Sequence, residues 1–244
     1  MGQEKEEQDF KGSRAAMLDL IGNANFKDLL VGIIKQENFQ FSDKELFMPK
    51  SKEDVKEAEL KDFLKDTEWT HLGDEIKKWW LEIFIPNVRT PNWDFISTCT
   101  INGEKGLLLV EAKAHSSEVN PKDKCTSENE ANINKIENAI NEAKAEINKT
   151  LLNNSISISK DSCYQLSNRI AHAWWLANQG IPVVLVYLGF LNREEMAGNG
   201  TIFKEDSDWQ TCFREYAAHV GVVNLIDKEI NTGKSQFKLI CRSY

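Results

Sequence analysis

The stretch Leu107-Leu-Leu-Val-Glu111-Ala-Lys113 decides the fold of this 244-residue chain. Its first four residues are all apolar, a pattern typical of a strand that is buried on both faces. Such a strand lies in the middle of a sheet that helices cover on both sides. The two charged residues that follow are two positions apart, so on a strand they share one face.

A turn signal, Asn102-Gly103, precedes this strand, and a second predicted strand, Asp94–Ile101, precedes the turn. A two-residue turn pairs Ile101 with Glu104 and places Asp94 opposite Glu111. A four-residue turn places Asp94 opposite Lys113 instead. Either register puts the three charged side chains on one face, whereas a three- or five-residue loop does not.

The remaining pattern predicts an α/β fold with a central mixed β-sheet flanked by helices on both faces. Apolar periodicity predicts helices over 14–36 (with Gly22 as a break), 51–65, 70–84, 128–152, 164–179 and 206–219, and strands over 181–191 and 236–242. Residues 1–64 are interpreted as an N-terminal helical segment that packs on a domain formed by 65–244. Residues 115–160 are interpreted as a helical insertion, and the whole chain as one compact domain.

The composition is that of an ordinary globular protein, with 41% hydrophobic and 28% charged residues. The net charge of −8 argues against coating of nucleic acid by bulk electrostatics, but not against a local cleft that binds it through metal ions. Five widely spaced cysteines contain no Cys-x-x-Cys pair, so neither a zinc site nor a disulfide framework is expected. The N-terminus lacks a signal-peptide core, and the longest apolar run, 181–191, is too short to cross a bilayer. A soluble, cytoplasmic protein without membrane contact is predicted.

Two carboxylates and an ammonium group at one strand end suit a divalent cation and an activated water. Directly opposed strand residues have Cβ atoms roughly 5 Å apart, where like charges destabilise the sheet unless a cation lies between them. Ligands that are all oxygen favour Mg²⁺, with Mn²⁺ as a substitute, over zinc. Lys113 would hold or deprotonate the water and offset transition-state charge, which points to phosphodiester hydrolysis.

This hypothesis depends on the strand that precedes Glu111 and Lys113, because the Glu-x-Lys pattern alone also occurs elsewhere in the chain. It appears again at Glu59-Leu-Lys61, Glu75-Ile-Lys77 and Glu142-Ala-Lys144, all in predicted helices. On a helix, residues two apart face different directions and cannot converge on one ion. The alternative interpretation is that Asp94 ends a strand and the other two residues form a solvated pair at the sheet rim.

Pro91-Asn-Trp-Asp94, Glu111-Ala-Lys113, the helix beginning Gln165-Leu-Ser-Asn-Arg169 and the strand over 182–190 together resemble the PD-(D/E)XK nuclease superfamily. The resemblance covers roughly residues 65–191 and implies a restriction-endonuclease-like αβββαβ core that cleaves DNA, less often RNA, with Mg²⁺. One departure is that Asp94 stands three positions after Pro91, where the usual motif has Pro-Asp.

The resemblance also implies roles for individual residues. Asp94, Glu111 and the backbone carbonyl of Ala112 become metal ligands, and Lys113 becomes the catalytic lysine. Many members add a carboxylate from the first core helix, for which Glu75 is the candidate and Glu82 and Glu68 are alternatives. Gln165 and Arg169 would support the site or touch a phosphate; otherwise they form the solvated edge of their helix.

Three functional hypotheses follow. The first is a Mg²⁺-dependent nuclease, acting on DNA rather than RNA, for which a homodimer is a natural arrangement because two strands need two sites. The second is a nuclease-like protein that binds nucleic acid or regulates without cleaving. The third is a partner-binding protein in which the insertion 115–160 serves as a lid or a dimerisation arm. His115 is interpreted as an ordinary strand-end histidine, and Trp79-Trp80 and Trp174-Trp175 as core residues rather than base-stacking platforms.

Overall fold

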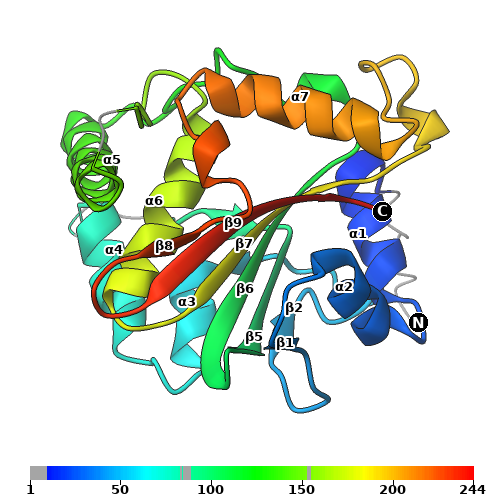
Figure 1. Cartoon of the computed structure of the whole chain (residues 1–244), viewed down its shortest axis with the longest axis horizontal. Helices are drawn as coiled ribbons and strands as arrows, with labels where there is room; N and C mark the ends of the chain where they lie inside the picture. The colour runs from blue at the N-terminus through cyan, green and yellow to red at the C-terminus, as the bar shows by residue number, and fades with distance from the viewer. Residues whose placement is uncertain (1–9, 83, 85–88, 153–154) are drawn as a thin grey trace, which may run out of the picture.

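Strand β6 (Glu104–Lys113) lies at the centre of a seven-stranded mixed sheet with the order β1-β5-β6-β7-β9-β8, in which β2 also pairs with β5 (Figure 1). The computed structural model describes residues 10–82, 84, 89–152 and 155–244. The other strands of this sheet are β1 (Phe39–Gln40), β2 (Phe47–Met48), β5 (Phe95–Ile101), β7 (Val183–Gly189), β8 (Glu229–Asn231) and β9 (Gln236–Ser243). Two short strands, β3 (Ala58–Glu59) and β4 (Asn92–Trp93), form a separate pair.

The turn between β5 and β6 has the two-residue form. Ile101 pairs with Glu104, and both Asn102 and Gly103 adopt positive φ values of 53° and 83°. Such a turn follows the right-handed twist of a hairpin, and Asn-Gly tolerates it best. Of the two registers that the sequence left open, the chain therefore adopts the two-residue one.

The continuous apolar run of β6 is buried on both faces, as predicted. Leu107, Leu108, Leu109 and Val110 are all 0% exposed. Strand β5 pairs antiparallel on one side, and β7 pairs parallel on the other, followed by β9, also parallel. The carboxyl ends of three parallel strands therefore meet at the edge of the sheet that holds Glu111 and Lys113.

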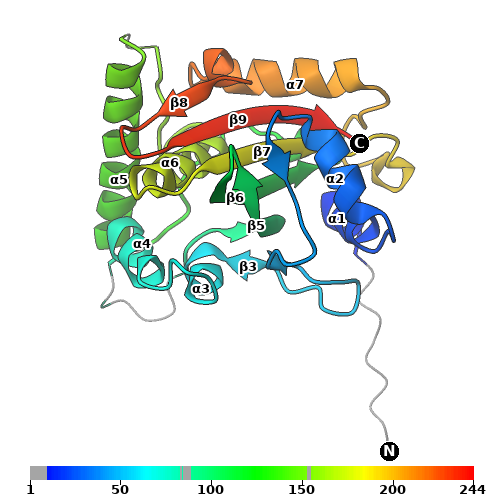
Figure 2. The ribbon, with the colours of Figure 1, turned by 60° about the horizontal axis from the view of Figure 1, so that its bottom comes forward.

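Helices cover both faces of the sheet (Figure 2). Helices α1 (Gly12–Ile21) and α2 (Phe26–Ile34), separated at Gly22 as predicted, bury their apolar residues with Leu108, Val110 and Ala112. The opposite face packs with Leu107 and Leu109 against α3 (Leu60–Lys65), α4 (Leu72–Trp80), α5 (Glu130–Thr150), α6 (Tyr164–Asn178) and α7 (Asp206–Ala218). The prediction of a mixed sheet with helices on both faces is confirmed.

Helix α6 has well-defined ends because both are capped. The carboxylate of Asp123 accepts hydrogen bonds from the N–H groups of Tyr164 and Gln165, each at 2.8 Å. Gly180 follows the helix with a φ of 95°, a conformation that glycine adopts without strain. The predicted helix over 164–179 is confirmed.

Two predicted helices are shorter than their patterns suggested. The predicted helix over 51–65 is wrong for its first part, because Ser51 forms a turn with the N–H groups of Glu53 and Asp54, and Ala58–Glu59 pairs with Asn92–Trp93. The predicted helix over 70–84 ends at Trp80, since Leu81 is extended and the side chain of Asn132 accepts the N–H of Glu82. Ile83 and Pro86, also part of that predicted helix and its end, lie outside the described residues.

The order of strands differs from the one expected. Between α4 and α6 the main sheet contains only β5 and β6, because β4 pairs with β3 instead. The outer edge of β5 is covered by β1 and β2, which come from the N-terminal segment. The prediction that residues 1–64 form a purely helical segment is therefore wrong, since two strands from this segment belong to the main sheet.

The insertion 115–160 packs on the domain through α5. The apolar stripe of this helix, which includes Ile136, Ile140, Ala143 and Ile147, is buried in the same cluster as α4 and α6. Figures 1 and 2 both show α5 lying alongside these two helices. This packing leaves the described part of α5 without the free apolar face that a dimerisation arm would need.

Candidate active site

Asp94 and Glu111 meet at the carboxyl edge of the sheet. The strand pair ends at Phe95 and Val110, so Asp94 lies one residue before β5, opposite Glu111 in the extended register. The prediction that Asp94 belongs to the strand is wrong by one residue. The prediction that Asp94 and Glu111 are neighbours is confirmed by the hydrogen bond of Asp94 to the next residue of β6.

The half-buried Asp94 takes the place of a missing strand partner for β6. Its Oδ2 accepts the N–H of Ala112 at 2.7 Å. Burial and, second, the nearby carboxylate of Glu111 raise the pKa of Asp94 from 3.8 to about 7. An ionised Asp94 is therefore destabilised in the absence of a further positive charge.

This raised pKa predicts a pH-dependent stability. The folded protein binds the Asp94 proton more tightly than the unfolded chain, so the contribution of Asp94 to the free energy of unfolding should fall as pH rises from 3.8 to about 7 and then level off. Asp94→Asn keeps an oxygen for the Ala112 N–H but cannot ionise, and it should gain stability relative to wild type across that window. Denaturant unfolding at closely spaced pH values measures the difference, with the exposed Asp66→Asn as control. A variant that loses stability relative to wild type as pH rises would contradict this account.

Glu111 is almost fully buried and lies between two cations. Its side chain is 3% exposed, Oε1 lies 2.7 Å from Lys113 Nζ, and Oε2 lies 2.7 Å from Arg169 Nε. Burial alone would raise the pKa of Glu111, but the two cations outweigh burial and hold the pKa below its ordinary value. Glu111 is therefore a carboxylate throughout the neutral range.

Lys113 is a buried ammonium group. Its side chain is 6% exposed, and although burial opposes the charge, Glu111 and then Asp94 raise the pKa of Lys113 above 10.5. A group held in its charged form is suited to stabilise negative charge rather than to remove a proton. Of the two roles considered from the sequence, this environment favours charge stabilisation.

Arg169 reaches the site from α6 and is buried, so the solvated-edge interpretation is wrong for this residue. Besides Glu111, its guanidinium donates to the backbone oxygen of Asn92 at 2.6 Å and to Asn168 Oδ1 at 3.3 Å. It also lies 4.3 Å from the ring centre of Trp93. Arg169 thereby fixes the Glu111 carboxylate to the chain that leads into Asp94.

The three candidates for an additional carboxylate do not join this cluster. Glu75 is exposed on α4, and Glu68 pairs at 2.7 Å with Lys105 near the hairpin end of β6. The hydrogen bond that Glu82 makes among the described residues runs from its backbone N–H to the side chain of Asn132. Within the residues that the structure describes, none of the three makes a hydrogen bond or ion pair with Asp94, Glu111 or Lys113.

The protein oxygens at the site are too few to complete the coordination of a metal ion without water or substrate. Across the described ranges, no group of three or more His, Cys, Asp or Glu side chains is arranged to hold a metal ion. The N–H and C=O of a strand residue project to the same side, so the carbonyl of Ala112 faces the Asp94 side of β6. Asp94, Glu111 and this carbonyl offer only oxygen donors, the kind that Mg²⁺ prefers, although Lys113 and Arg169 each already contact one Glu111 oxygen.

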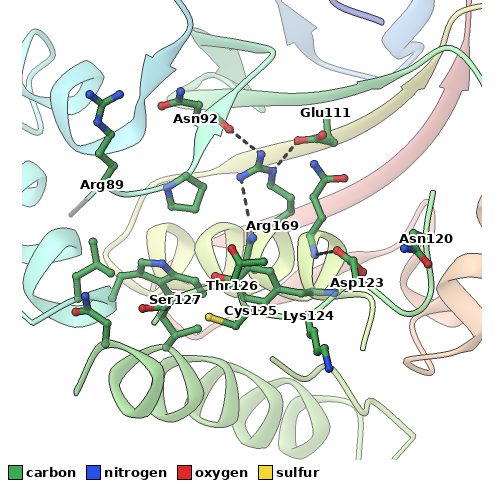
Figure 3. A pocket seen from close by; sticks show the side chains of 18 of the residues that line it. Arg89, Asn92, Glu111, Asn120, Asp123, Lys124, Cys125, Thr126, Ser127 and Arg169 are labelled. Atoms are coloured by element: carbon green, nitrogen blue, oxygen red, sulfur yellow. Dashed lines mark hydrogen bonds and ion pairs between the residues drawn. The ribbon is translucent and has the colours of Figure 1, made fainter. Parts of the chain in front are cut away.

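A cavity of about 730 Å³ opens beside this cluster (Figure 3). Asp94, Glu111, Gln165 and Arg169 line the cavity, whereas Lys113 does not. No residue pattern in the sequence indicated most of the remaining wall, which includes Glu57, Arg89, Glu118, Asn120, Asp123, Lys124, Thr126, Ser127, Asn132, Tyr164 and Asn168. These residues come from loops and helix starts without a periodic pattern. Asp123 caps α6 from 41 residues earlier in the chain, so no local capping pattern indicates it.

The histidines and tryptophans near the site are structural. His115 is buried beside Glu118, and Trp80, Trp174 and Trp175 are at most 5% exposed. Burial lowers the pKa of His172 to about 3, and its ring packs 4.4 Å from that of Trp80. The prediction that the tryptophan pairs belong to the core is confirmed for these three tryptophans, and Trp79 packs partly buried against them.

No helix in the described part of the chain is long and apolar enough to cross a membrane. All five cysteines are free thiols. Comparison of the chain with models of known protein families, with curated proteins and with solved structures found no match.

Proposed function

We propose that this protein is a Mg²⁺-dependent nuclease that hydrolyses phosphodiester bonds, with DNA favoured over RNA as substrate. The observation that carries the proposal is the meeting of Asp94, which directly precedes β5, with Glu111 and Lys113 of β6 at one edge of the sheet. Among the four Glu-x-Lys strings, this string alone ends a buried central strand. Its neighbours are a buried arginine and a cavity large enough for a substrate.

The order of elements supports a restriction-endonuclease-like core. Helix α4, the hairpin β5–β6, helix α6 and the parallel strand β7 follow one another as in the proposed αβββαβ arrangement. The edge strand next to β5 is supplied from residues 39–48 instead of from the segment after α4. We regard this as a rearrangement of the edge of the sheet that leaves the strands carrying Asp94 and Glu111 in place.

The residues of the chain have separable roles in this proposal. Asp94, Glu111 and the Ala112 carbonyl would hold Mg²⁺, which when bound would polarise the phosphate and lower the pKa of a water. Lys113 stabilises the negative charge that develops on the phosphate oxygens. Arg169 positions Glu111 and, because of its own charge, keeps this carboxylate ionised.

The metal requirement is tested by cleavage and by metal binding together. Single- and double-stranded DNA and RNA are incubated with the protein in Mg²⁺, in Mn²⁺ and in EDTA, and cleavage is expected only with metal. Crystals soaked in Mn²⁺ should show an ion between Asp94 and Glu111. Asp94→Asn should lose both the ion and cleavage, whereas Asp66→Asn, on an exposed helix end, should retain both. Metal-independent cleavage, or an ion bound elsewhere, would overturn this site.

A second function, nucleic-acid binding without cleavage, is favoured by one specific feature. Both carboxylate oxygens of Glu111 are already engaged by cations, Lys113 on Oε1 and Arg169 on Oε2. If both ion pairs of Glu111 stay formed, the protein would bind a phosphate backbone but not Mg²⁺. Binding of DNA with no cleavage and no Mn²⁺ at Asp94 would favour this function over the nuclease.

A further inference from the structure

The first half of the insertion forms part of the wall of the cavity beside Asp94. One side is formed by the segment from Glu118 to Ser127 and by Asn132 and Ile136 at the start of α5. The rest of the wall includes the chain around Asn92 and the first turn of α6, with Tyr164 and Gln165, which Asp123 contacts directly. Its volume of about 730 Å³ falls within the range of pockets that enclose small molecules.

This recess is preformed, because the insertion is tied to the domain at several points. The carboxylate of Asp123 caps α6, and within the insertion the Cys125 N–H donates to the Lys160 oxygen at 2.7 Å, which joins its two ends. The Cys163 N–H and the Ser162 hydroxyl both donate to the Pro121 oxygen, at 3.1 and 3.0 Å. The wall is therefore part of the folded domain, so a substrate has to fit the recess as it stands.

The position of the acids restricts what reaches them. Glu111 is 3% exposed, and Asp94 is half-buried behind the rim of the recess. A phosphate that contacts Asp94 must bring its own nucleotide into the recess. A nucleotide stacked and paired in a duplex cannot enter a recess of this size unless it first leaves the stack.

The lining suits a base better than a row of phosphates. Eight of its side chains are neutral amides or hydroxyls, five are carboxylates that would repel phosphates and three are cations, and apolar surface is supplied by Trp80, Leu81, Pro91 and Ile136. Among the described residues, the side chains of Asn92, Thr126 and Gln165 have no hydrogen-bond partner and are free to bind the edges of a base. The lining cation nearest the acids, Arg169, is already paired with Glu111.

Two exposed cations flank the recess. Arg89 and Lys124 both line it, and Figure 3 shows them on opposite sides. Arg89 has a long contact of 3.8 Å with Glu59, and within the described chain Lys124 has no ion-pair partner. A single strand that crosses the recess would bring its flanking phosphates to these two side chains.

From these observations we infer that the recess takes one unpaired nucleotide, so that the substrate is a single strand or an unpaired position in a duplex. This inference rests on the proposed nuclease function and specifies its substrate. A single-strand substrate also removes the need for two sites, and thus for a dimer.

The test compares one DNA sequence in three forms: single-stranded, fully paired, and paired with one unpaired nucleotide. Because a paired nucleotide must first leave the stack, single-stranded DNA and the duplex with an unpaired nucleotide should both be cleaved at least about ten times faster than the full duplex. Thr126→Trp fills the recess from its exposed wall and should slow cleavage of the single strand about ten-fold or more, since the nucleotide loses its place. Thr150→Trp, at the far end of α5, is the matched control and should leave cleavage unchanged. Thermal melting shows that both variants are folded.

Binding measured with Lys113→Met separates this inference from the proposed function. This variant retains the recess, so its affinity for single-stranded DNA should exceed its affinity for duplex, and Thr126→Trp should abolish the difference. If the wild type cleaves nothing but this binding preference is found, the nuclease proposal fails and the recess assignment survives. Equal or stronger binding and cleavage of the full duplex, or no binding of either form, would overturn the recess assignment.

Discussion

Lys113→Met is expected to reduce Mg²⁺-dependent cleavage by a factor of roughly 10² to 10³, the usual loss when one preorganised charge-stabilising group is removed. The fold should survive this change. Methionine fills most of the lysine volume, and Glu111 keeps its ion pair with Arg169, which also keeps its contact with the chain at Asn92. Single-turnover cleavage together with thermal melting measures both effects.

The chain contains a matched control for this experiment. Glu142-Ala-Lys144 repeats the letters of Glu111-Ala-Lys113, but it lies on α5, where Lys144 contacts only the Asn141 side chain among the described residues. Lys144→Met should leave both cleavage and melting unchanged. Equal cleavage by Lys113→Met and Lys144→Met would remove Lys113 from the mechanism.

Arg169→Met is expected to produce the largest loss of stability. It leaves Glu111 buried with Lys113 as its sole cation, and it removes the donor to the Asn92 oxygen. Breaking a buried ion pair by removing one partner costs about 3–5 kcal/mol of unfolding free energy. Denaturant unfolding of the metal-free protein measures this loss directly.

The control for this prediction is Arg193→Met. Arg193 pairs with Asp19 and Glu195 near the surface, where a salt bridge contributes about 1 kcal/mol or less. Adding Glu111→Gln to Arg169→Met should recover part of the loss, because it removes a buried carboxylate that has kept only one of its two cations, with a coupling energy of about 0.5–3 kcal/mol. Equal losses in Arg169→Met and Arg193→Met, or a coupling of zero, would show that the pair does not stabilise the fold.

Local patterns predicted the part of the fold that depends on local chemistry. The apolar run before Glu111 identified a central strand, and Asn102-Gly103 determined a turn whose register follows from backbone geometry. The helix over 164–179 was predictable for the same reason, since its apolar periodicity and Gly180 both lie in the segment itself. The predicted helix over 51–65 failed where pairing with Asn92–Trp93 supplied a competing set of backbone hydrogen bonds.

The candidate site likewise has a part that local patterns predicted and a part that they did not. The sequence by itself determined that Glu111 and Lys113 share a strand face and that Asp94 lies beside them, because strand periodicity and a two-residue turn leave few alternatives. Only the tertiary structure decided that Arg169 pairs with Glu111, that Glu75 lies away from the site, and that the insertion walls a recess. Those features depend on how helices and loops distant in sequence pack against the sheet, and no local pattern of residues encodes that packing.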